Sequence, residues 1–257
     1  MADGNTYVAN CSLLYADTPP LRRAAAAVAD GYRELEFWWP FDSSVPGEAE
    51  SARFVDSVHE SGAQVIAMNF TLGDPECGGR GILSHPDRRN EFAEHLEVLA
   101  GLVARLGIRW CHAPYGLALA VSTPQQQRDT AVANLMLAAD RLRPLGAAPM
   151  VEPTSGVIDY PVVTAADAVA LITDVEAAAG RPGAVGLLAD LYHLAANGED
   201  IAGVLRAHWG RIVHVQVADF PGRHEPGTGE LDIDGYLRML HELGYRGRVA
   251  LEYIPSL

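Results

Sequence analysis

Four side chains that carry oxygen atoms able to bind a metal lie at the ends of apolar runs, or within them, in the second half of the chain: Glu152, Asp190, Gln216 and Glu252. If these runs are neighbouring parallel strands, the four side chains face one common opening. Three carboxylates that converge there without a compensating Lys or Arg repel one another, and a divalent cation with oxygen ligands is the usual remedy. Oxygen ligands favour Mg²⁺ or Mn²⁺, whereas zinc sites favour Cys and His. The sequence therefore predicts a divalent metal site that takes Mg²⁺ or Mn²⁺.

Each of these residues also has a structural explanation. An Asp before a helical stretch is often only an N-cap, and Asp190 fits that use. This explanation is weak for Glu152, because Pro153 follows it and Glu is a poor cap, and for Glu252, because no helix is expected after it. Gln216 lies between two valines, and a polar side chain that points into a packed barrel is unusual unless something there needs it. Glu152 and Glu252 are therefore the stronger candidates for function.

Further candidates are polar side chains near the expected strand ends or in the loops that follow them: Asn69, Arg80, His112, His193, His214 and Arg223. Arg80 and Arg223 each lie in a glycine-rich loop near the same opening, where a guanidinium can hold a substrate carboxylate in two-point geometry. A solvated surface position explains Arg80 equally well. His193 and His214 also fit ordinary hydrogen-bonded histidines.

The elements that would position these residues alternate along the whole chain. Strands are expected at residues 6–12, 34–38, 63–69, 108–112, 147–152, 184–189, 212–217 and 249–253. Helices are expected at 21–30, 48–61, 86–106, 123–145 and 164–179, and within 195–208 and 233–243. Eight strands that alternate with helices predict a (β/α)₈ TIM barrel whose final helix is reduced or absent. An open doubly wound sheet is disfavoured, because no glycine fingerprint follows the first strand.

Composition limits the classes of function. The 257 residues include 19 basic and 33 acidic side chains, a net charge of −14, and 49% of them are hydrophobic, which predicts one compact domain over residues 1–257. The acidic balance opposes nucleic acid and anionic membrane surfaces as partners and leaves small molecules and metal cations. Three cysteines without CxxC spacing and no leader-like N-terminus predict a cytoplasmic protein with reduced thiols. Because the final helix is expected to be reduced or absent, one side of the barrel would be thinly covered, which suggests that a second copy covers it in a homodimer.

Six segments make the chain recognisable: 36–42 (Glu-Phe-Trp-Trp-Pro-Phe-Asp), 79–82 (Gly-Arg-Gly-Ile), 151–153 (Val-Glu-Pro), 190–193 (Asp-Leu-Tyr-His), 214–219 (His-Val-Gln-Val-Ala-Asp) and 225–230 (Glu-Pro-Gly-Thr-Gly-Glu). With them the chain resembles the hydroxypyruvate isomerase family, a branch of the xylose isomerase-like barrels. The similarity covers nearly the whole chain in order, and its most specific element is the segment 225–230.

The resemblance implies divalent-metal ligands at Glu152, Asp190, Gln216 and Glu252. It also implies that Glu152 and Glu252 form the acid/base pair and that His193 and Arg223 contact the substrate. Further candidate substrate contacts are Asn69, Arg80, His112 and Glu225. The implied activity is aldose–ketose isomerisation of a small hydroxy-keto acid, of the type that converts hydroxypyruvate to tartronate semialdehyde, through a metal-stabilised enediolate.

Two positions depart from the family pattern. Ile254 stands where family members commonly carry Lys, and His112 stands where smaller residues are usual. A pocket without that cation would also suit a neutral polyol, so a ketose 3-epimerase or an inosose-type dehydratase is the alternative. A barrel that only binds sugar or metal needs no opposed acid/base pair and is disfavoured. Endonuclease-type repair is disfavoured too, because its zinc site needs more histidines at strand ends and because a charge of −14 opposes DNA.

Overall fold

Eight parallel strands close into a barrel in the computed structural model, which describes residues 7–73 and 79–256. The strands are β1 (Val8–Asn10), β2 (Glu34–Phe37), β3 (Gln64–Asn69), β4 (Trp110–His112), β5 (Ala148–Val151), β6 (Gly186–Asp190), β7 (Ile212–Val217) and β8 (Val249–Leu251). Each strand pairs with the next along the chain, and β8 pairs with β1. The predicted barrel is confirmed.

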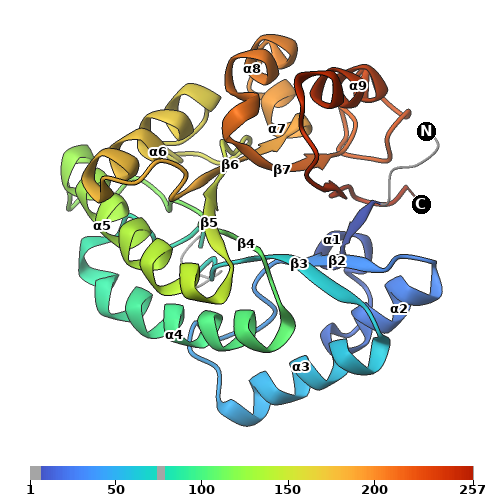
Figure 1. Ribbon diagram of the computed structural model, residues 1–257, viewed down its shortest axis with the longest axis horizontal. Coiled ribbons are helices and arrows are strands. Elements are labelled where there is room, and N and C mark those ends of the chain that lie inside the picture. The colour runs from blue at the N-terminus through green and yellow to red at the C-terminus, as the bar shows by residue number, and fades with distance from the viewer. Residues whose placement is uncertain (1–6, 74–78, 257) are drawn as a thin grey trace.

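A ring of helices surrounds the strands (Figure 1). In the described part of the chain they are α1 (Cys11–Leu14), α2 (Arg23–Ala29), α3 (Glu48–Ser61), α4 (Arg89–Leu106), α5 (Pro124–Leu142), α6 (Ala165–Ala179), α7 (Leu191–Ala196), α8 (Ile201–His208) and α9 (Ile233–Leu243). Residues 252–256, which follow β8, form no helix. Within the described residues no helix combines the length and the apolar character that a membrane span requires.

Helix ends follow local signals in the sequence. Thr123 and Thr164 form capping boxes. Each threonine hydroxyl accepts the backbone N–H of the residue three positions later, and the side chain of that residue accepts the backbone N–H of the threonine. Gly62 and Gly107 end α3 and α4 with φ values of 73° and 69°, a left-handed conformation that a β-carbon would oppose. These signals explain why the long helices lie close to their expected bounds.

A helix begins directly after two of the strands. The expected end is wrong for β1, which stops at Asn10 instead of residue 12, whereas β6 ends at Asp190, one residue beyond its expected end. Asn10 Oδ1 accepts the backbone N–H groups of Ser12 and Leu13, and Asp190 Oδ1 accepts that of Tyr192. Each side chain therefore caps a helix, α1 or α7, directly after its strand. The strand expected over 6–12 is shortened to β1, and α7 precedes the helix expected within 195–208.

The main apolar core lies between the barrel and the helices, whereas one end of the barrel interior is polar. Along β7, Val215 and Val217 belong to the apolar core, and His214 and Gln216 lie on the opposite face of the same strand. Both polar side chains are buried, and so is Glu36 on β2. The barrel therefore contains a buried polar cluster beneath its carboxyl-terminal opening.

Candidate functional site

A cavity of about 290 Å³ opens at the carboxyl ends of the strands. Among its lining residues are seven of the sequence-predicted candidates: Asn69, Arg80, His112, Glu152, His193, Arg223 and Glu252. These residues come from strand ends, from the loops that follow β3 and β7, and from α7, which follows β6, so they lie on the face at which TIM barrels carry their active sites. The volume is at the small end of the range for ligand pockets, which suits a small substrate.

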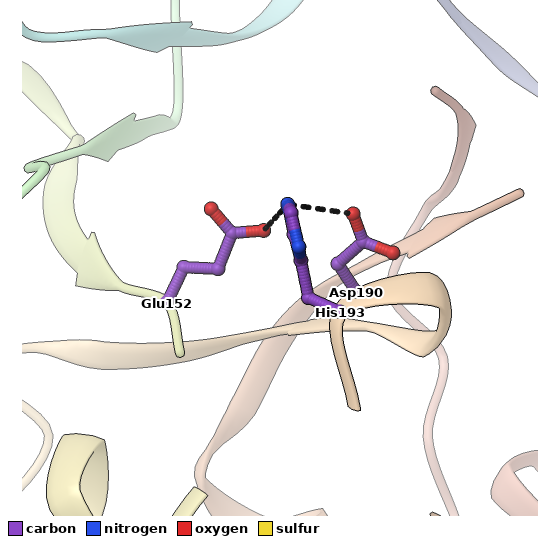
Figure 2. A group of neighbouring side chains, drawn as sticks. All are labelled: Glu152, Asp190 and His193. Carbon is purple, nitrogen blue, oxygen red and sulfur yellow. Dashed lines mark ion pairs between the residues drawn. The ribbon is translucent and has the colours of Figure 1, made fainter. Parts of the chain in front are cut away.

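A buried cluster of two carboxylates and one imidazole lies at the cavity, where Glu152 and His193 belong to the lining and Asp190 lies behind them (Figure 2). His193 Nε2 lies 3.7 Å from Asp190 Oδ2 and 4.0 Å from Glu152 Oε1. All three side chains are at least nine-tenths buried. Their potential ligand atoms lie within 4.8 Å of one another, so this group could hold a metal ion.

The hydrogen bonds of His193 define which ring nitrogen it presents to the cavity and whether that nitrogen carries a proton. Ser155 donates its backbone N–H to His193 Nδ1 at 3.0 Å, so Nδ1 is an acceptor and the ring proton sits on Nε2. Burial lowers the pKa of His193, which favours this neutral form. Nε2 therefore offers a hydrogen to the cavity and no lone pair, so His193 suits a contact with substrate oxygen better than a metal bond.

Three of the four predicted metal ligands keep an oxygen that has no hydrogen-bond partner. Glu152 Oε1, Asp190 Oδ2 and Gln216 Oε1 are all buried and lack such a partner among residues 7–73 and 79–256. In two of these side chains the second polar atom does form a hydrogen bond: Asp190 Oδ1 caps α7, and Gln216 Nε2 donates to Glu36 at 2.7 Å. Asp190 and Gln216 also stand opposite each other in the β6–β7 register. Buried acceptors without donors are costly, and a bound divalent cation would satisfy them, so these residues fit the predicted metal.

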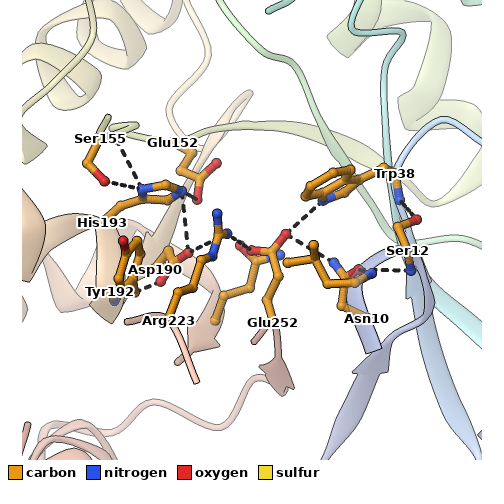
Figure 3. A network of polar contacts seen from close by, with 12 residues as sticks. Asn10, Ser12, Trp38, Glu152, Ser155, Asp190, Tyr192, His193, Arg223 and Glu252 are labelled. Atoms are coloured by element: carbon orange, nitrogen blue, oxygen red, sulfur yellow. Dashed lines mark hydrogen bonds and ion pairs between the residues drawn. The ribbon is translucent and has the colours of Figure 1, made fainter. Parts of the chain in front are cut away.

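The fourth predicted ligand, Glu252, follows β8 and directs a single oxygen into the cavity. Its Oε1 accepts hydrogen bonds from Trp38 Nε1 at 2.7 Å and from Asn10 Nδ2 at 3.1 Å (Figure 3). Its Oε2 lies 3.3 Å from Arg223 Nη2. Burial, together with the nearby Asp190 carboxylate, raises the pKa of Glu252 to about 8 against the opposing effect of Arg223.

Glu152 lies across the cavity from Glu252, with the Arg223 guanidinium between them (Figure 3). Burial raises the pKa of Glu152 well above its usual range, and the charges of Asp190 and Glu252 add to the effect. Its Oε2 lies 3.4 Å from His112 Nε2. Burial lowers the pKa of His112 to about 3, so this imidazole is neutral and does not compensate the carboxylate charge.

Arg223 is the cation closest to the carboxylates among the described ion pairs of the cavity. Its Nη2 lies 3.3 Å from Glu252 Oε2 and 3.6 Å from Asp190 Oδ2, and the guanidinium lies 5.2 Å from the centre of the Tyr192 ring. The loop that carries it is held by Asp219, which is fully buried and accepts backbone N–H groups from residues 220, 227 and 231. Arg223 Nε is buried and has no hydrogen-bond partner in the described part of the chain, so a donor is available to a bound carboxylate.

The other two loop candidates lie in different places. Arg80 is an exposed residue at the edge of the cavity, and it forms no ion pair within residues 7–73 and 79–256. Glu225 does not line the cavity, because its carboxylate accepts the backbone N–H and the hydroxyl of Ser256. The structure therefore brings Arg80 to the site and directs Glu225 to the chain segment after β8.

Several cavity residues were not predicted from the sequence. Trp38 lines the cavity and donates to Glu252, and Ser155 orients His193. Trp38 lies in the recognisable segment 36–42, which was the available signal, but its partner is 214 positions away. His214 does not line the cavity; it is buried at 2.6 Å from Glu36, as the ordinary hydrogen-bonded interpretation expects.

Comparisons with known proteins agree with this geometry. The model of the family described as "Xylose isomerase-like TIM barrel" matches residues 24–256. A Streptomyces coelicolor protein provisionally named a hydroxypyruvate isomerase is 38% identical over 96% of this chain and 90% of its own length. A 2-oxo-tetronate isomerase from Cupriavidus necator is 30% identical over 97% of this chain and 92% of its own length.

Among solved structures, a family 2 AP endonuclease from Brucella melitensis superposes with a TM-score of 0.88 at 28% identity. The alignment covers 99% of this chain and 95% of that one. These findings confirm the predicted fold and the resemblance on which the sequence interpretation relied.

Proposed function

The chain belongs to the xylose isomerase-like TIM barrel family, and from this premise we propose that it is an isomerase that interconverts the ketose and aldose forms of a small hydroxy-keto acid. Its named relatives are isomerases of small keto acids, which supports this class of reaction. The observation that carries the proposal is the pair of buried glutamates, Glu152 and Glu252, on opposite sides of a small cavity. Two opposed carboxylates can remove a proton from one carbon and return it to the next.

Glu152, Asp190, Gln216 and Glu252 are the residues that would hold a divalent cation. Three of them have a buried oxygen that finds no hydrogen-bond partner among the described residues, and the fourth, Glu252, directs its Oε2 towards the cavity. When bound, the cation supplies positive charge against the negative charge that develops on substrate oxygens. The donor set of carboxylate and amide oxygens favours Mg²⁺ or Mn²⁺ over zinc.

The glutamates carry the proton transfer. One of them removes the proton from the hydroxyl-bearing carbon of the substrate, and the electron pair of the broken C–H bond forms the enediolate. A proton then returns to the former carbonyl carbon, and the proton of the original hydroxyl moves to the former carbonyl oxygen, which gives the aldehyde product. Glu252 Oε1 already accepts two hydrogen bonds, so Oε2 is the oxygen of this residue that faces the reacting groups.

The remaining cavity groups position the substrate. His193 Nε2–H is a donor for a substrate oxygen, and Arg223 and Arg80 are cations that recognise a carboxylate. A carboxylate near Arg80 would form an ion pair that this arginine lacks in the described residues. The small cavity and its two arginines favour a short acid over a neutral sugar.

The proposal is tested by incubating the protein with Mn²⁺ and hydroxypyruvate, a four-carbon hydroxy-keto acid or a neutral ketose, and identifying products by NMR. We expect an aldehyde product from a keto acid. Inversion at the carbon next to a retained ketone would instead indicate an epimerase, and loss of water would indicate a dehydratase. No conversion of any of these substrates would favour a binding protein over the proposed enzyme.

A further inference from the structure

A second buried carboxylate network lies beneath the cavity and is centred on Glu36. Glu36 Oε1 accepts hydrogen bonds from Asn10 Nδ2 at 2.8 Å and from Gln216 Nε2 at 2.7 Å. His214 Nε2 lies 2.6 Å from Glu36 Oε2. Glu36 is 2% exposed and does not line the cavity, so it reaches a substrate only through its partners. The network joins β1, β2 and β7.

The chemistry of these partners fixes the direction of one amide. A side-chain amide has a donor end and an acceptor end, and an ionised carboxylate only accepts hydrogen bonds. Glu36 Oε1 accepts from Gln216 Nε2 and so holds the amide in the orientation in which its NH₂ faces β2. The opposite end of the amide is Gln216 Oε1, the buried oxygen without a partner. If the amide were reversed, its oxygen would face the Glu36 carboxylate and its NH₂ would face the metal ligands.

Asn10 is oriented independently of Glu36 and strengthens the arrangement. Its Oδ1 accepts the backbone N–H groups of Ser12 and Leu13, so its NH₂ must point the other way. That NH₂ bridges the carboxylates of Glu36 and Glu252. The Glu36 carboxylate is thus held in place from three sides, by Asn10, Gln216 and His214, and its direction is well defined.

We propose that Glu36 is a positioning residue that orients the Gln216 amide so that its carbonyl oxygen faces the metal site. This inference rests on the proposed function, because it requires that Gln216 is a metal ligand. Glu36 acts through Gln216 and touches neither the cation nor the substrate. A network that only joined the strands would contribute to stability but would not select between the two ends of the amide.

The test is the affinity of the protein for Mn²⁺ alone, measured from the electron paramagnetic resonance signal of free Mn²⁺. Glu36→Gln keeps the shape of the side chain but offers both a donor and an acceptor, so either orientation of Gln216 can be bonded. We expect the variant to bind Mn²⁺ about 10- to 100-fold more weakly, the usual effect of losing a group that orients a ligand. Glu34→Gln is the matched control, because Glu34 lies on the same strand and pairs with Arg248. The control should bind Mn²⁺ as the wild type does.

A double-mutant cycle separates orientation of the ligand from a general effect on the barrel. In a Gln216→Leu background, Glu36→Gln should change the Mn²⁺ affinity less than about 3-fold, since the two changes remove one shared interaction. Equal losses in both backgrounds, or a wild-type affinity in Glu36→Gln, would overturn the inference while leaving the metal site intact. Failure of the wild type to bind Mn²⁺ would overturn the proposed metal site as well.

A crystal structure of the wild type with Mn²⁺ gives the same answer without a variant that could fail to fold. Gln216 Oε1 should coordinate the ion while Gln216 Nε2 stays within hydrogen-bond distance of Glu36. A bound ion without Gln216 in its coordination shell, or a Gln216 amide turned away from Glu36, would contradict the proposed role.

Discussion

Glu252→Gln should abolish turnover and at the same time stabilise the metal-free protein. The substitution keeps an acceptor oxygen for Trp38 and Asn10, which bond Oε1 in the structure. It removes the carboxylate that the structure places near Asp190 and Glu152 in a buried site. Activity should fall by roughly 10²- to 10⁴-fold, the usual contribution of a general acid or base.

The stability gain can be estimated from the pKa of Glu252, which the fold raises from 4.5 to about 8. The carboxyl of Glu252 thus holds its proton more tightly in the native protein than in the unfolded chain. The resulting loss of folding stability is absent below the ordinary pKa and grows as the pH rises towards the native pKa. At about pH 7 it amounts to roughly 3 kcal/mol, since each pH unit above the ordinary value contributes about 1.4 kcal/mol. In the variant, the new amide NH₂ would face the guanidinium of Arg223. This contact between two hydrogen-bond donors offsets about 1 kcal/mol of the gain.

A net gain of about 2 kcal/mol corresponds to a rise in Tm of roughly 4–8 °C for a chain of this length. Thermal unfolding of chelator-treated wild type and variant at about pH 5 and about pH 8 measures it, and the gain should be larger at the higher pH. Glu97→Gln is the control, since Glu97 forms an exposed ion pair with Arg141 and its loss should change stability by less than about 1 kcal/mol. A Glu252→Gln variant that is less stable than the wild type at both pH values would refute the reasoning.

Three further predictions follow from the same geometry. The affinity for Mn²⁺, measured by calorimetry, should increase as the pH rises from about 6 to about 8, because Glu152 and Glu252 have raised pKa values and must lose their protons to bind a cation; a constant affinity would contradict this. Arg80→Gln should raise KM for an acid substrate by roughly 10-fold with little change in kcat, as expected for losing a charge-assisted hydrogen bond, and an unchanged KM would remove Arg80 from substrate binding. Asp219→Asn should lower Tm and raise KM together, because the Asp219 carboxylate fixes the loop that carries Arg223; a lower Tm with an unchanged KM would show that the loop is not needed to place that arginine.

The fold was predictable because its signals are local. Alternating strands and helices, with caps such as Thr123 and end residues such as Gly107, were sufficient to predict the barrel. The same topology brings strand-end residues together at one opening, so the sequence alone predicts a common site for Glu152 and Glu252. The early end of β1 and the presence of α7 were not predicted, because Asn10 and Asp190 use their side chains to begin a helix earlier than the apolar pattern indicates.

The parts that could not be predicted depend on contacts between distant segments. Glu36 and His214 are 178 positions apart, and no local pattern pairs them. The loop after β7 places Arg223 in the cavity and Glu225 outside it, a choice that depends on the backbone bonds to Asp219 and on Ser256. Residue type alone marks both loop residues as candidates, but only the path of the chain separates them.

The central claim is that this barrel removes and returns a proton next to a substrate carbonyl with the help of a divalent cation. It is tested most directly by NMR of deuterium incorporation from ²H₂O into hydroxypyruvate, four-carbon hydroxy-keto acids and neutral ketoses, with and without Mn²⁺ or Mg²⁺. We predict metal-dependent exchange at the carbon next to the carbonyl of a keto acid, and its loss in Glu252→Gln. Absence of exchange in every substrate, or exchange that persists without a divalent cation, would contradict the account.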